Sequence, residues 1–290
     1  IGDGAFWCCS SLSSLVIPNS VTSIGDGAFE GCSSLSSLFI PDSVVNIKGN
    51  PFYLWKGKLE CLSASFIYED NVLFNMDKSK LISYRNQEAK SFIISDGVKS
   101  IGKCAFVDCY SLVSISIPNS VTNIGDGAFD GCSSLNNLVI PNSVTSIGDG
   151  AFNGCSSLCS LVISNSVTSI GAWAFSGCKS LSNITIPDSL TSIGAWAFDG
   201  CSSLRSLVIP NSVTSIDACA FSGCKSLSNI TIPDSLTSIG AWAFNDCSSL
   251  RDLVIPNSVN DIEDRAFEGC NFPDNLKQEL ISRFGNKIFG

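Results

Sequence analysis

Apolar and polar positions repeat along this chain with a period of 23 residues. One regular unit, residues 135–155, reads LNNLVIPNSVTSIGDGAFNGC, and the same order returns along most of the chain. A fixed period of this length is typical of a solenoid, whose units bury apolar side chains only against their neighbours. An Ala-Phe pair marks the register at Phe6, Phe29, Phe106, Phe129, Phe152, Phe175, Phe198, Phe221, Phe244 and Phe267, and Phe52 keeps it with a proline in front.

Each unit predicts the same succession of short elements. Residues 135–140 alternate like a strand, which Pro141 ends because proline lacks a backbone donor. Val144 and Ile147 return apolar side chains to the inside, and residues 148–150 form a tight turn where a positive φ is expected. The following Ala-Phe pair plugs the core and leads into a helical turn. Stacked units would form a parallel sheet on the inner face, with strands about 4.8 Å apart, and short strands and helical turns on the outer face.

The regularity of the pattern divides the chain into four segments. Regular units fill residues 1–47 and 101–270, an irregular insertion occupies residues 48–100, and residues 271–290 follow the last unit. The chain begins inside a unit without a capping segment. Because an uncapped solenoid end exposes core, we expect the natural protein to continue upstream.

The insertion predicts a β-hairpin or an irregular repeat. Three short apolar runs, at 66–68, 72–74 and 81–84, are separated by the polar turns 69–71 and 76–79. Two interpretations stay open: an insertion that the scaffold tolerates, or a patch that contacts a partner, since functional residues concentrate on loops held by a rigid scaffold. The aromatic residues that would form this patch are Tyr53, Trp55, Tyr68 and Tyr84.

The last segment predicts a helix that caps the array. Four apolar side chains between Leu276 and Phe284 fall on one helical face. Asp274 or Asn275 is the expected N-cap, and Gly285 the expected stop. The alternative, an interfacial membrane helix, would need a broader basic face.

The unit resembles the 23-residue leucine-rich repeats of the BspA-like bacterial surface proteins. The signature Ile-Pro-x-Ser-Val-Thr-x-Ile-Gly-x-x-Ala-Phe carries the resemblance over nearly the whole chain, and an acidic turn followed by Val-Leu-Phe-Asn in the insertion adds to it. The resemblance implies a leucine-rich-repeat solenoid on the cell surface or secreted, with adhesion to host, neighbouring-cell or extracellular-matrix proteins. It implies no catalytic residues.

The charge balance argues against a nucleic-acid partner. The formal net charge is −9, and it is uneven: residues 48–103 carry nine basic and six acidic residues, a local +3, which leaves −12 for the remainder. Binding to a phosphate backbone needs clustered Lys and Arg, which the acidic array lacks. No apolar run is long enough to span a bilayer, so membrane insertion is not expected either.

Enzymatic chemistry has no support in the residue types present. The chain contains no histidine, the commonest general base. It also lacks a phosphate-binding loop, a dinucleotide fingerprint and a nucleophile elbow. We therefore expect a non-enzymatic protein without cofactors.

Ten of the fifteen cysteines occupy one repeat position, three residues after the phenylalanine. Stacking would put them in a ladder of parallel side chains, which does not suit disulfide geometry, so we expect buried thiols that act as small apolar fillers. Zinc is not expected, because the chain has no histidine and the Cys155/Cys159 pair stands alone. Local disulfides stay open for Cys104 with Cys109 and for Cys219 with Cys224.

Three surfaces are candidates for binding. Concave solenoid faces commonly bind proteins, and the outward residues of the predicted sheet include Phe39, Val139, Val162, Thr185, Val208, Thr231 and Val254. A second surface is the row of Trp173, Trp196 and Trp242, two residues before the phenylalanine. The Gly-Asp-Gly turns are the third, but one aspartate per unit is too sparse for calcium, so we interpret these as turn formers. For the sheet and the tryptophans, solvation and simple packing over the next turn remain alternatives.

These observations favour a protein-binding surface repeat, adhesin-like in type, with a structural spacer as the alternative. The working hypothesis is that residues 53–84 and the inner face contact a protein partner. A spacer would be uniform along every face, whereas the insertion and the tryptophans break the repeat. The sequence leaves the oligomeric state and the identity of the partner open.

Overall fold

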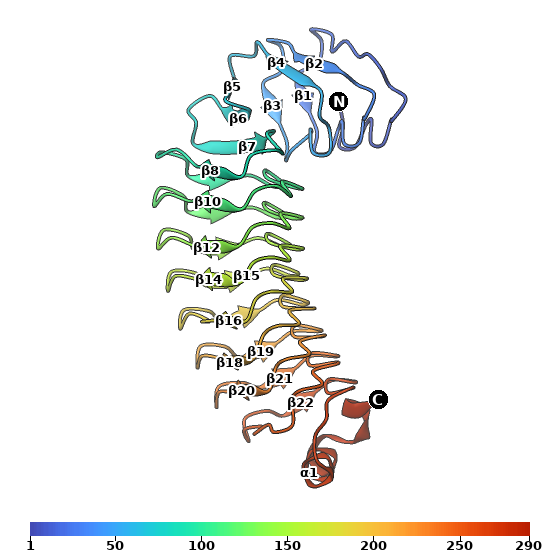
Figure 1. Cartoon of the computed structure of the whole chain (residues 1–290), viewed down its shortest axis with the longest axis vertical. Helices are drawn as coiled ribbons and strands as arrows, with labels where there is room; N and C mark the ends of the chain where they lie inside the picture. Colours follow the sequence, from blue (N-terminus) through green and yellow to red (C-terminus); the bar gives the residue numbers. More distant parts are fainter.

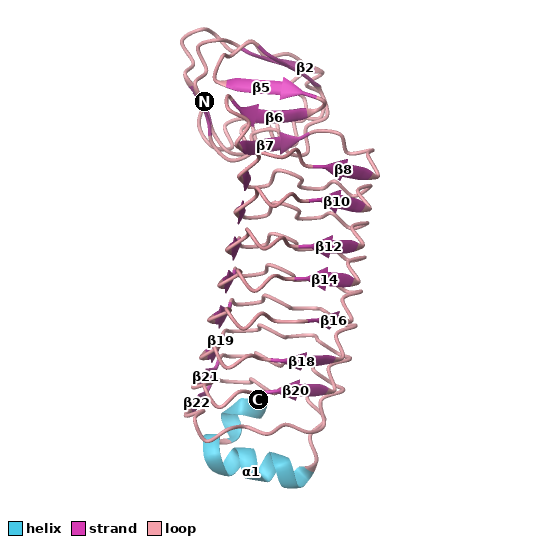
Figure 2. Ribbon diagram, turned by 90° about the vertical axis from the view of Figure 1, so that its left-hand side faces the viewer, coloured by secondary structure: helices cyan, strands magenta, loops and turns pink.

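The computed structural model describes residues 1–290, which form a curved solenoid of stacked coils closed by one helix (Figure 1). The predicted leucine-rich-repeat solenoid, with its parallel sheet and its C-terminal helix, is confirmed. Most regular coils contribute one strand to each of two parallel sheets and then turn back, in most cases through Gly-x-x-Ala-Phe. Figure 2 shows the two sheets on opposite sides of the array.

The first sheet consists of the strands that precede the proline of each coil, or the serine that replaces it in two coils, at Ser95 and Ser164. Its register steps by 23 residues, for example Asn137 opposite Ser160 and Val139 opposite Val162. It comprises β8 (Ser91–Ile93), β10 (Ser114–Ser116), β12 (Asn137–Val139), β14 (Ser160–Val162) and β16 (Asn183–Ile184), followed by the pair β18 (Ser206–Val208) and β20 (Asn229–Thr231). Since β8 is part of this sheet, regular coils already begin inside the insertion segment.

The second sheet is formed by Ser-Ile, Asn-Ile or Asp-Ile pairs that follow the turn after the first-sheet position of each coil. Their isoleucines are buried while the preceding polar residues face outward, as the strand period requires. The strands are β9 (Ser100–Ile101), β11 (Asn123–Ile124), β13 (Ser146–Ile147), β15 (Ser169–Ile170), β17 (Ser192–Ile193), β19 (Ser215–Ile216), β21 (Ser238–Ile239) and β22 (Asp261–Ile262).

Stacked phenylalanines form the centre of the array. Phe152 and Phe175 lie 5.4 Å apart between ring centroids with an interplanar angle of 2°, and similar stacking continues from Phe106 to Phe267. A shorter stack joins Phe6, Phe29 and Phe52. No single coil could bury these rings, so the repeat is stable only as an array.

The insertion separates two hydrophobic cores. Its three antiparallel strands, β5 (Phe66–Glu69), β6 (Val72–Asn75) and β7 (Lys80–Tyr84), extend the second sheet beyond β9, which confirms the expected hairpin. Leu73 and Ile82 pack into a core of 15 residues with the N-terminal coils, whereas Phe74 and Leu81 pack into the core of 66 residues in the main array. Strands β6 and β7 therefore separate the two cores and are buried on both faces. We call this pair of strands the septum.

The N-terminal coils form two small parallel pairs on the other side of this septum. Strand β1 (Ser23–Ile24) pairs with β3 (Asn46–Ile47), and β2 (Ser37–Ile40) pairs with β4 (Lys58–Cys61). In Figure 1 this part is turned relative to the main array, and the hairpin lies between the two.

The helix α1 (Asp274–Phe284) covers the last coil, followed by the 3₁₀ turn η1 (Asn286–Phe289). Leu280 is buried, and Leu276 and Phe284 pack against the core. The expected N-cap is wrong: Pro273 occupies that position and no side chain caps the helix, while Asp274 lies in the first turn, where a carboxylate favours the helix dipole. Gly285 ends the helix with φ of 83°, as predicted. No helix in the molecule combines the length and the apolar character needed to cross a bilayer.

Candidate binding surfaces

The outward side chains of the first sheet form an exposed apolar stripe. Val139, Val162 and Val208 are 54–66% exposed; Val254, at the equivalent position of the last coil, is 78% exposed, and Phe39 in the separate β2–β4 pair is 42% exposed. Thr185 and Thr231 hold the equivalent positions in their coils and are also exposed. A row of serine and asparagine side chains, including Ser114, Asn137 and Ser160, runs beside the stripe.

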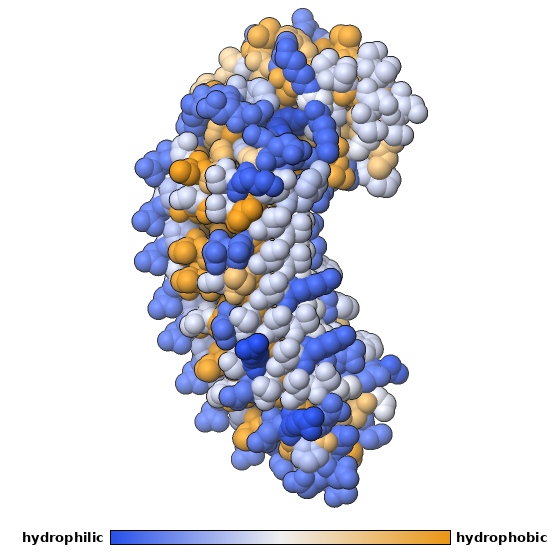
Figure 3. Space-filling view, in the orientation of Figure 1, coloured by the Kyte–Doolittle hydropathy of each residue, from blue (hydrophilic) through white to orange (hydrophobic).

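Part of the stripe lies over β10, β12 and β14. There a depression of about 450 Å³ is lined by Ile115, Ile117, Val139, Ile140 and Val162, among others. Figure 3 shows hydrophobic side chains gathered on this flank of the molecule. Side chains of this kind, left in water by a rigid sheet, are typical of a surface that contacts another protein.

The structure adds Ile93 to this stripe. It lies opposite Ser116 in the register between β8 and β10, and it is 74% exposed. Sequence reasoning missed it because the 23-residue register is lost inside the insertion. One sequence signal could have revealed Ile93. It is the Ser-Phe-Ile run that this residue ends, followed by Gly97 and the Ser100-Ile101 pair.

The tryptophan row lies on the turns that connect the second sheet to the phenylalanines. Trp173, Trp196 and Trp242 are 37–49% exposed and have φ of 54–61°. Glycine holds this position in most earlier coils, with the same left-handed backbone, at Gly127 and Gly150 for example. The tryptophans therefore adopt a conformation that costs a side-chain-bearing residue about 1–2 kcal/mol.

A shallow slot separates the last two tryptophans. Cys219, only 4% exposed, forms its floor between Trp196 and Trp242, and Ser222 and Asn245 complete the lining. The volume of the slot is about 470 Å³. Partly exposed tryptophans beside hydrogen-bonding groups suit an interface, because the indole has an apolar body and a polar N–H.

Two of the four aromatic residues expected to be exposed in the insertion are buried. Trp55 is 2% exposed, extends the N-terminal stack beside Phe52 at 5.8 Å, and donates from Nε1 to the Leu35 carbonyl at 2.7 Å. Tyr84 is 7% exposed and begins the main stack, 5.0 Å from Phe106. Each ring ends a phenylalanine ladder at the septum, so the expectation of an exposed patch is wrong for both.

Tyr53 and Tyr68 are half-buried and do not form one patch with them. Tyr53 lies at the junction between the N-terminal coils and the main array, where burial is the main cause that raises the pKa of its phenol, with Glu30 adding to it. Tyr68 lies on β5 and packs against the smaller core.

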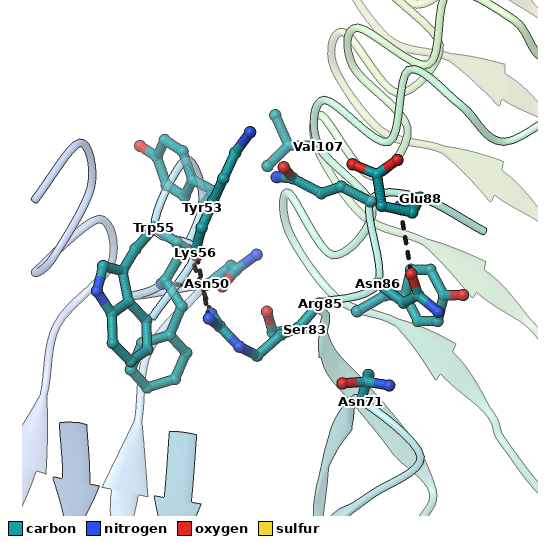
Figure 4. A pocket seen from close by; sticks show the side chains of 13 residues that line it. Asn50, Tyr53, Trp55, Lys56, Asn71, Ser83, Arg85, Asn86, Glu88 and Val107 are labelled. Carbon is teal, nitrogen blue, oxygen red and sulfur yellow. Dashed lines mark hydrogen bonds between the residues drawn. The ribbon is translucent and has the colours of Figure 1, made fainter. Parts of the chain in front are cut away.

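The junction itself contains a pocket of about 300 Å³ (Figure 4). Tyr53, Trp55 and Lys56 approach it from the N-terminal coils, and Glu88 and Val107 from the main array. Across this junction the amide of Asn50, which is 2% exposed, donates to the Cys104 carbonyl at 2.7 Å. Lys103 and Asp26 form an ion pair at 2.7 Å. The two solenoid parts are therefore tied together beside the pocket.

The cysteine ladder is as predicted in nine of its ten positions. These thiols are buried and free, and eight of them lie 3.0–3.4 Å from the carbonyl of a phenylalanine 26 residues earlier. Cys9, in the first coil, is exposed. Cys104, Cys109, Cys219 and Cys224 are free as well, so no local disulfide forms.

The aspartates of the Gly-Asp-Gly turns connect neighbouring coils. Oδ1 of Asp3, Asp26, Asp126 and Asp149 accepts a backbone N–H from the next coil at 2.8–3.1 Å. The structural role expected for them is thus confirmed and extended from the turn to the coil boundary. No group of three or more His, Cys, Asp or Glu side chains converges in a way that could hold a metal ion.

Comparison with known proteins agrees with this architecture. A model of the BspA type leucine-rich repeat region matches residues 1–87, 81–205 and 168–290. A leucine-rich repeat protein from Eubacterium ventriosum is similar in structure, with a TM-score of 0.64, 29% identity, and coverage of 89% of this chain and 64% of that one. No curated protein matches the chain significantly.

Two further solved structures are similar. A leucine-rich cell surface protein from Faecalibacterium prausnitzii gives a TM-score of 0.57 with 35% identity, over 79% of this chain and 55% of that one. The leucine-rich repeat protein of T. pallidum gives a TM-score of 0.57 with 29% identity, over 75% of this chain and 92% of that one. The chain spans less than two thirds of the length of the first two proteins. With matches over its whole length, the chain belongs to the BspA type of leucine-rich repeat proteins.

Proposed function

We propose that this chain is a non-enzymatic, protein-binding repeat of an adhesin-like protein that is secreted or displayed on the cell surface. The partner would be a host or extracellular-matrix protein. The observation that carries the proposal is the exposed valine stripe on the first sheet, with its depression over β10, β12 and β14. The cell-surface description of the Faecalibacterium relative supports the location.

The stripe has the features of an interface on a rigid scaffold. Its backbone is fixed by parallel pairing on both sides, so an associating protein would meet a surface that loses little conformational entropy. The apolar row supplies area to bury, and the neighbouring serine and asparagine row supplies hydrogen bonds at its rim. A structural spacer would need neither the exposed apolar row nor the hydrogen-bonding row beside it.

The proposal is tested by placing charge on the stripe. The double variant Val139→Lys/Val162→Lys adds two charges to exposed positions, and Ser180→Lys/Ser248→Lys adds the same charge to exposed turns outside the stripe. Binding to a panel of immobilised, purified extracellular-matrix proteins would be measured by surface plasmon resonance. We expect the wild type to bind at least one of them and the stripe variant to bind about tenfold more weakly or worse.

The control variant should bind like the wild type, and circular dichroism should show all three proteins folded. Equal binding by the stripe variant would reject this surface. Absence of binding to the whole panel would favour the spacer function instead.

A further inference from the structure

Tryptophan occupies three turns whose backbone favours glycine. Trp173, Trp196 and Trp242 have φ of 54–61°, a conformation that bulky side chains disfavour, and other coils have glycine there, as at Gly127 and Gly150. Core packing does not explain the exchange, because each indole is 37–49% exposed. A strained residue whose side chain is left in water indicates a function at the surface.

The same coils also lack the aspartate that connects other coils. In the regular turns, Oδ1 of Asp126 and of Asp149 accepts a backbone N–H from the next coil. Alanine replaces this aspartate directly before each of the three tryptophans, at Ala172, Ala195 and Ala241. The exchange removes a carboxylate from the position beside each indole. Because a cation bound to the indoles would be stabilised by such carboxylates, their loss favours an uncharged ligand.

The slot between Trp196 and Trp242 has an uncharged lining. Cys219, which is 4% exposed, forms its floor, and Ser222 and Asn245 complete it. Burial raises the pKa of the Cys219 thiol, which keeps this group neutral. The slot therefore offers a charged ligand no counter-ion among the residues that line it.

The hydrogen-bonding groups of the slot are mainly donors. Nε1 of Trp55 donates to a carbonyl, whereas Nε1 of Trp196 and of Trp242 has no acceptor in the protein, and an indole N–H can only donate. The amide of Asn245 makes a long contact of 3.4 Å with the Glu268 carbonyl. The charge distribution of the slot is thus complementary to a ligand that has apolar surface and carbonyl oxygens but no net charge.

A polyproline II segment of a protein has these properties. Proline has an apolar ring and no backbone N–H, and the helix has no internal hydrogen bonds, so its carbonyl oxygens are free to accept. Three residues make one turn of about 9.3 Å, so prolines i and i+3 lie on one face at that separation.

The spacing of the tryptophans suits one turn of such a segment. Trp196 and Trp242 are two coils apart. Neighbouring coils are spaced by about 4.8 Å at paired strands and by 5.4 Å at the phenylalanine rings of these coils. Two coils therefore span nearly the same distance as one polyproline II turn, with Cys219 below the residues between the two prolines.

We propose that the slot between Trp196 and Trp242 binds a proline-rich segment of the partner protein in the polyproline II conformation, with prolines i and i+3 on the two indoles. Aromatic grooves recognise such segments because the preformed helix loses little conformational entropy on binding. A glycan would also stack on indoles, but its hydroxyl groups bring donors for which the slot has few acceptors. The inference rests on the proposed protein-binding function and names a class of partner sequence.

The test uses the full chain and two uncharged peptides, acetyl-Gly-Pro-Ser-Pro-Pro-Ser-Pro-Gly-amide and its counterpart with alanine at every proline. Binding would be followed by NMR at the indole N–H signals of the five tryptophans. We expect the proline peptide to shift the signals of Trp196 and Trp242 but not that of the buried Trp55. It should bind at least about tenfold more tightly than the alanine peptide. Cellohexaose serves as the glycan.

The variant Trp242→Gly removes one indole without disturbing the turn, because glycine has this position in other coils and suits its backbone. Circular dichroism should show it folded like the wild type, and it should bind the proline peptide at least about tenfold more weakly. Trp7→Ala is the control. It removes an exposed tryptophan outside the row and should bind like the wild type.

Equal binding of the two peptides, binding of neither, or unchanged binding by Trp242→Gly would overturn the proposal. So would a shift of the Trp7 signal as large as those of the slot. Binding of cellohexaose without the proline peptide would assign the slot to a glycan and overturn it as well. The peptide test needs no natural partner, so it can fail while the stripe test succeeds, and the reverse.

Discussion

Oδ1 of Asp149 accepts the backbone N–H of Ala172 at 2.8 Å, across the boundary between two coils. The same carboxylate would lie 2.5 Å from a Cβ built on Gly171. The two coils therefore approach so closely at this turn that a side chain on Gly171 would collide with the aspartate that bonds the next residue. The relationship repeats where Asp126 meets Asp149 and Gly148.

Replacement of Asp149 by alanine should lower the free energy of unfolding by about 1–2 kcal/mol, because the Ala172 N–H loses its acceptor. Asp149→Asn keeps an oxygen at this position and should retain most of the stability. Urea denaturation followed by circular dichroism measures both. The control is Asp234→Ala, at an exposed position whose side chain makes no hydrogen bond; a loss as large there would show that the coil-to-coil bond is not the cause.

Gly150 and Gly171 lie at this turn, and their φ angles alone would suggest that only Gly150 resists replacement by alanine. We expect the reverse order, with the larger loss of stability at Gly171. Gly150 has φ of 59°, but a Cβ there meets only the Cβ of Asn153 at 3.9 Å. Three coils carry tryptophan at the same backbone conformation. Gly150→Ala should therefore cost only about 1 kcal/mol.

Gly171→Ala should cost clearly more, because its Cβ would overlap both the backbone nitrogen and the carboxylate of Asp149. Thermal denaturation of the two variants side by side makes the comparison. A larger loss in Gly150→Ala than in Gly171→Ala would contradict the role of close approach.

The sequence alone could predict what each coil repeats, since periodic apolar positions determine which side chains face inward. It could not assign the reason for each glycine, because the need for close approach at Gly171 arises from the neighbouring coil. The insertion shows the same limit. Continuous apolar runs such as Val72–Phe74 are typical of strands buried on both faces, but only the stacking of separate coils shows that two cores meet there.

The candidate binding surfaces could be predicted only where the chain keeps the 23-residue register. The valine stripe follows from strand alternation, so every member placed on the regular coils is exposed as expected. Trp55 and Tyr84 were misplaced because their register inside the insertion could not be read, and each instead ends a phenylalanine ladder. Arg85, which lines the junction pocket, was missed for the same reason, because the carbonyls that accept its hydrogen bonds belong to residues 28 to 33 positions away.

Phenylalanines in the middle of the ladder should each stabilise the array strongly. Phe175 is fully buried and stacks on both Phe152 and Phe198 at 5.4 Å. Phe175→Ala should lower the free energy of unfolding by about 3–5 kcal/mol, because a cavity opens between rings that cannot close up. Urea denaturation would measure it against Val162→Ala, an exposed position where the loss should stay below about 0.5 kcal/mol. Similar losses for the two would contradict a continuous dry ladder.

The buried cysteines should make stability fall at alkaline pH. Burial raises the pKa of Cys178 well above 9.0, its usual value, with Cys201 adding to the shift. The folded state therefore keeps the proton while the unfolded chain releases it. The contribution of Cys178 is complete below about pH 9 and declines above it, by about 1.4 kcal/mol between about pH 8 and pH 10.

The variant Cys178→Ala lacks this contribution. Across that pH interval it should lose about 1.4 kcal/mol less unfolding free energy than the wild type, measured by urea denaturation at each pH. Cys159→Ala removes an exposed cysteine outside the ladder and should follow the wild type. If the unfolding free energies of Cys178→Ala and the wild type declined in parallel with pH, the thiol would ionise equally in the folded and unfolded states. That result would contradict a buried ladder position.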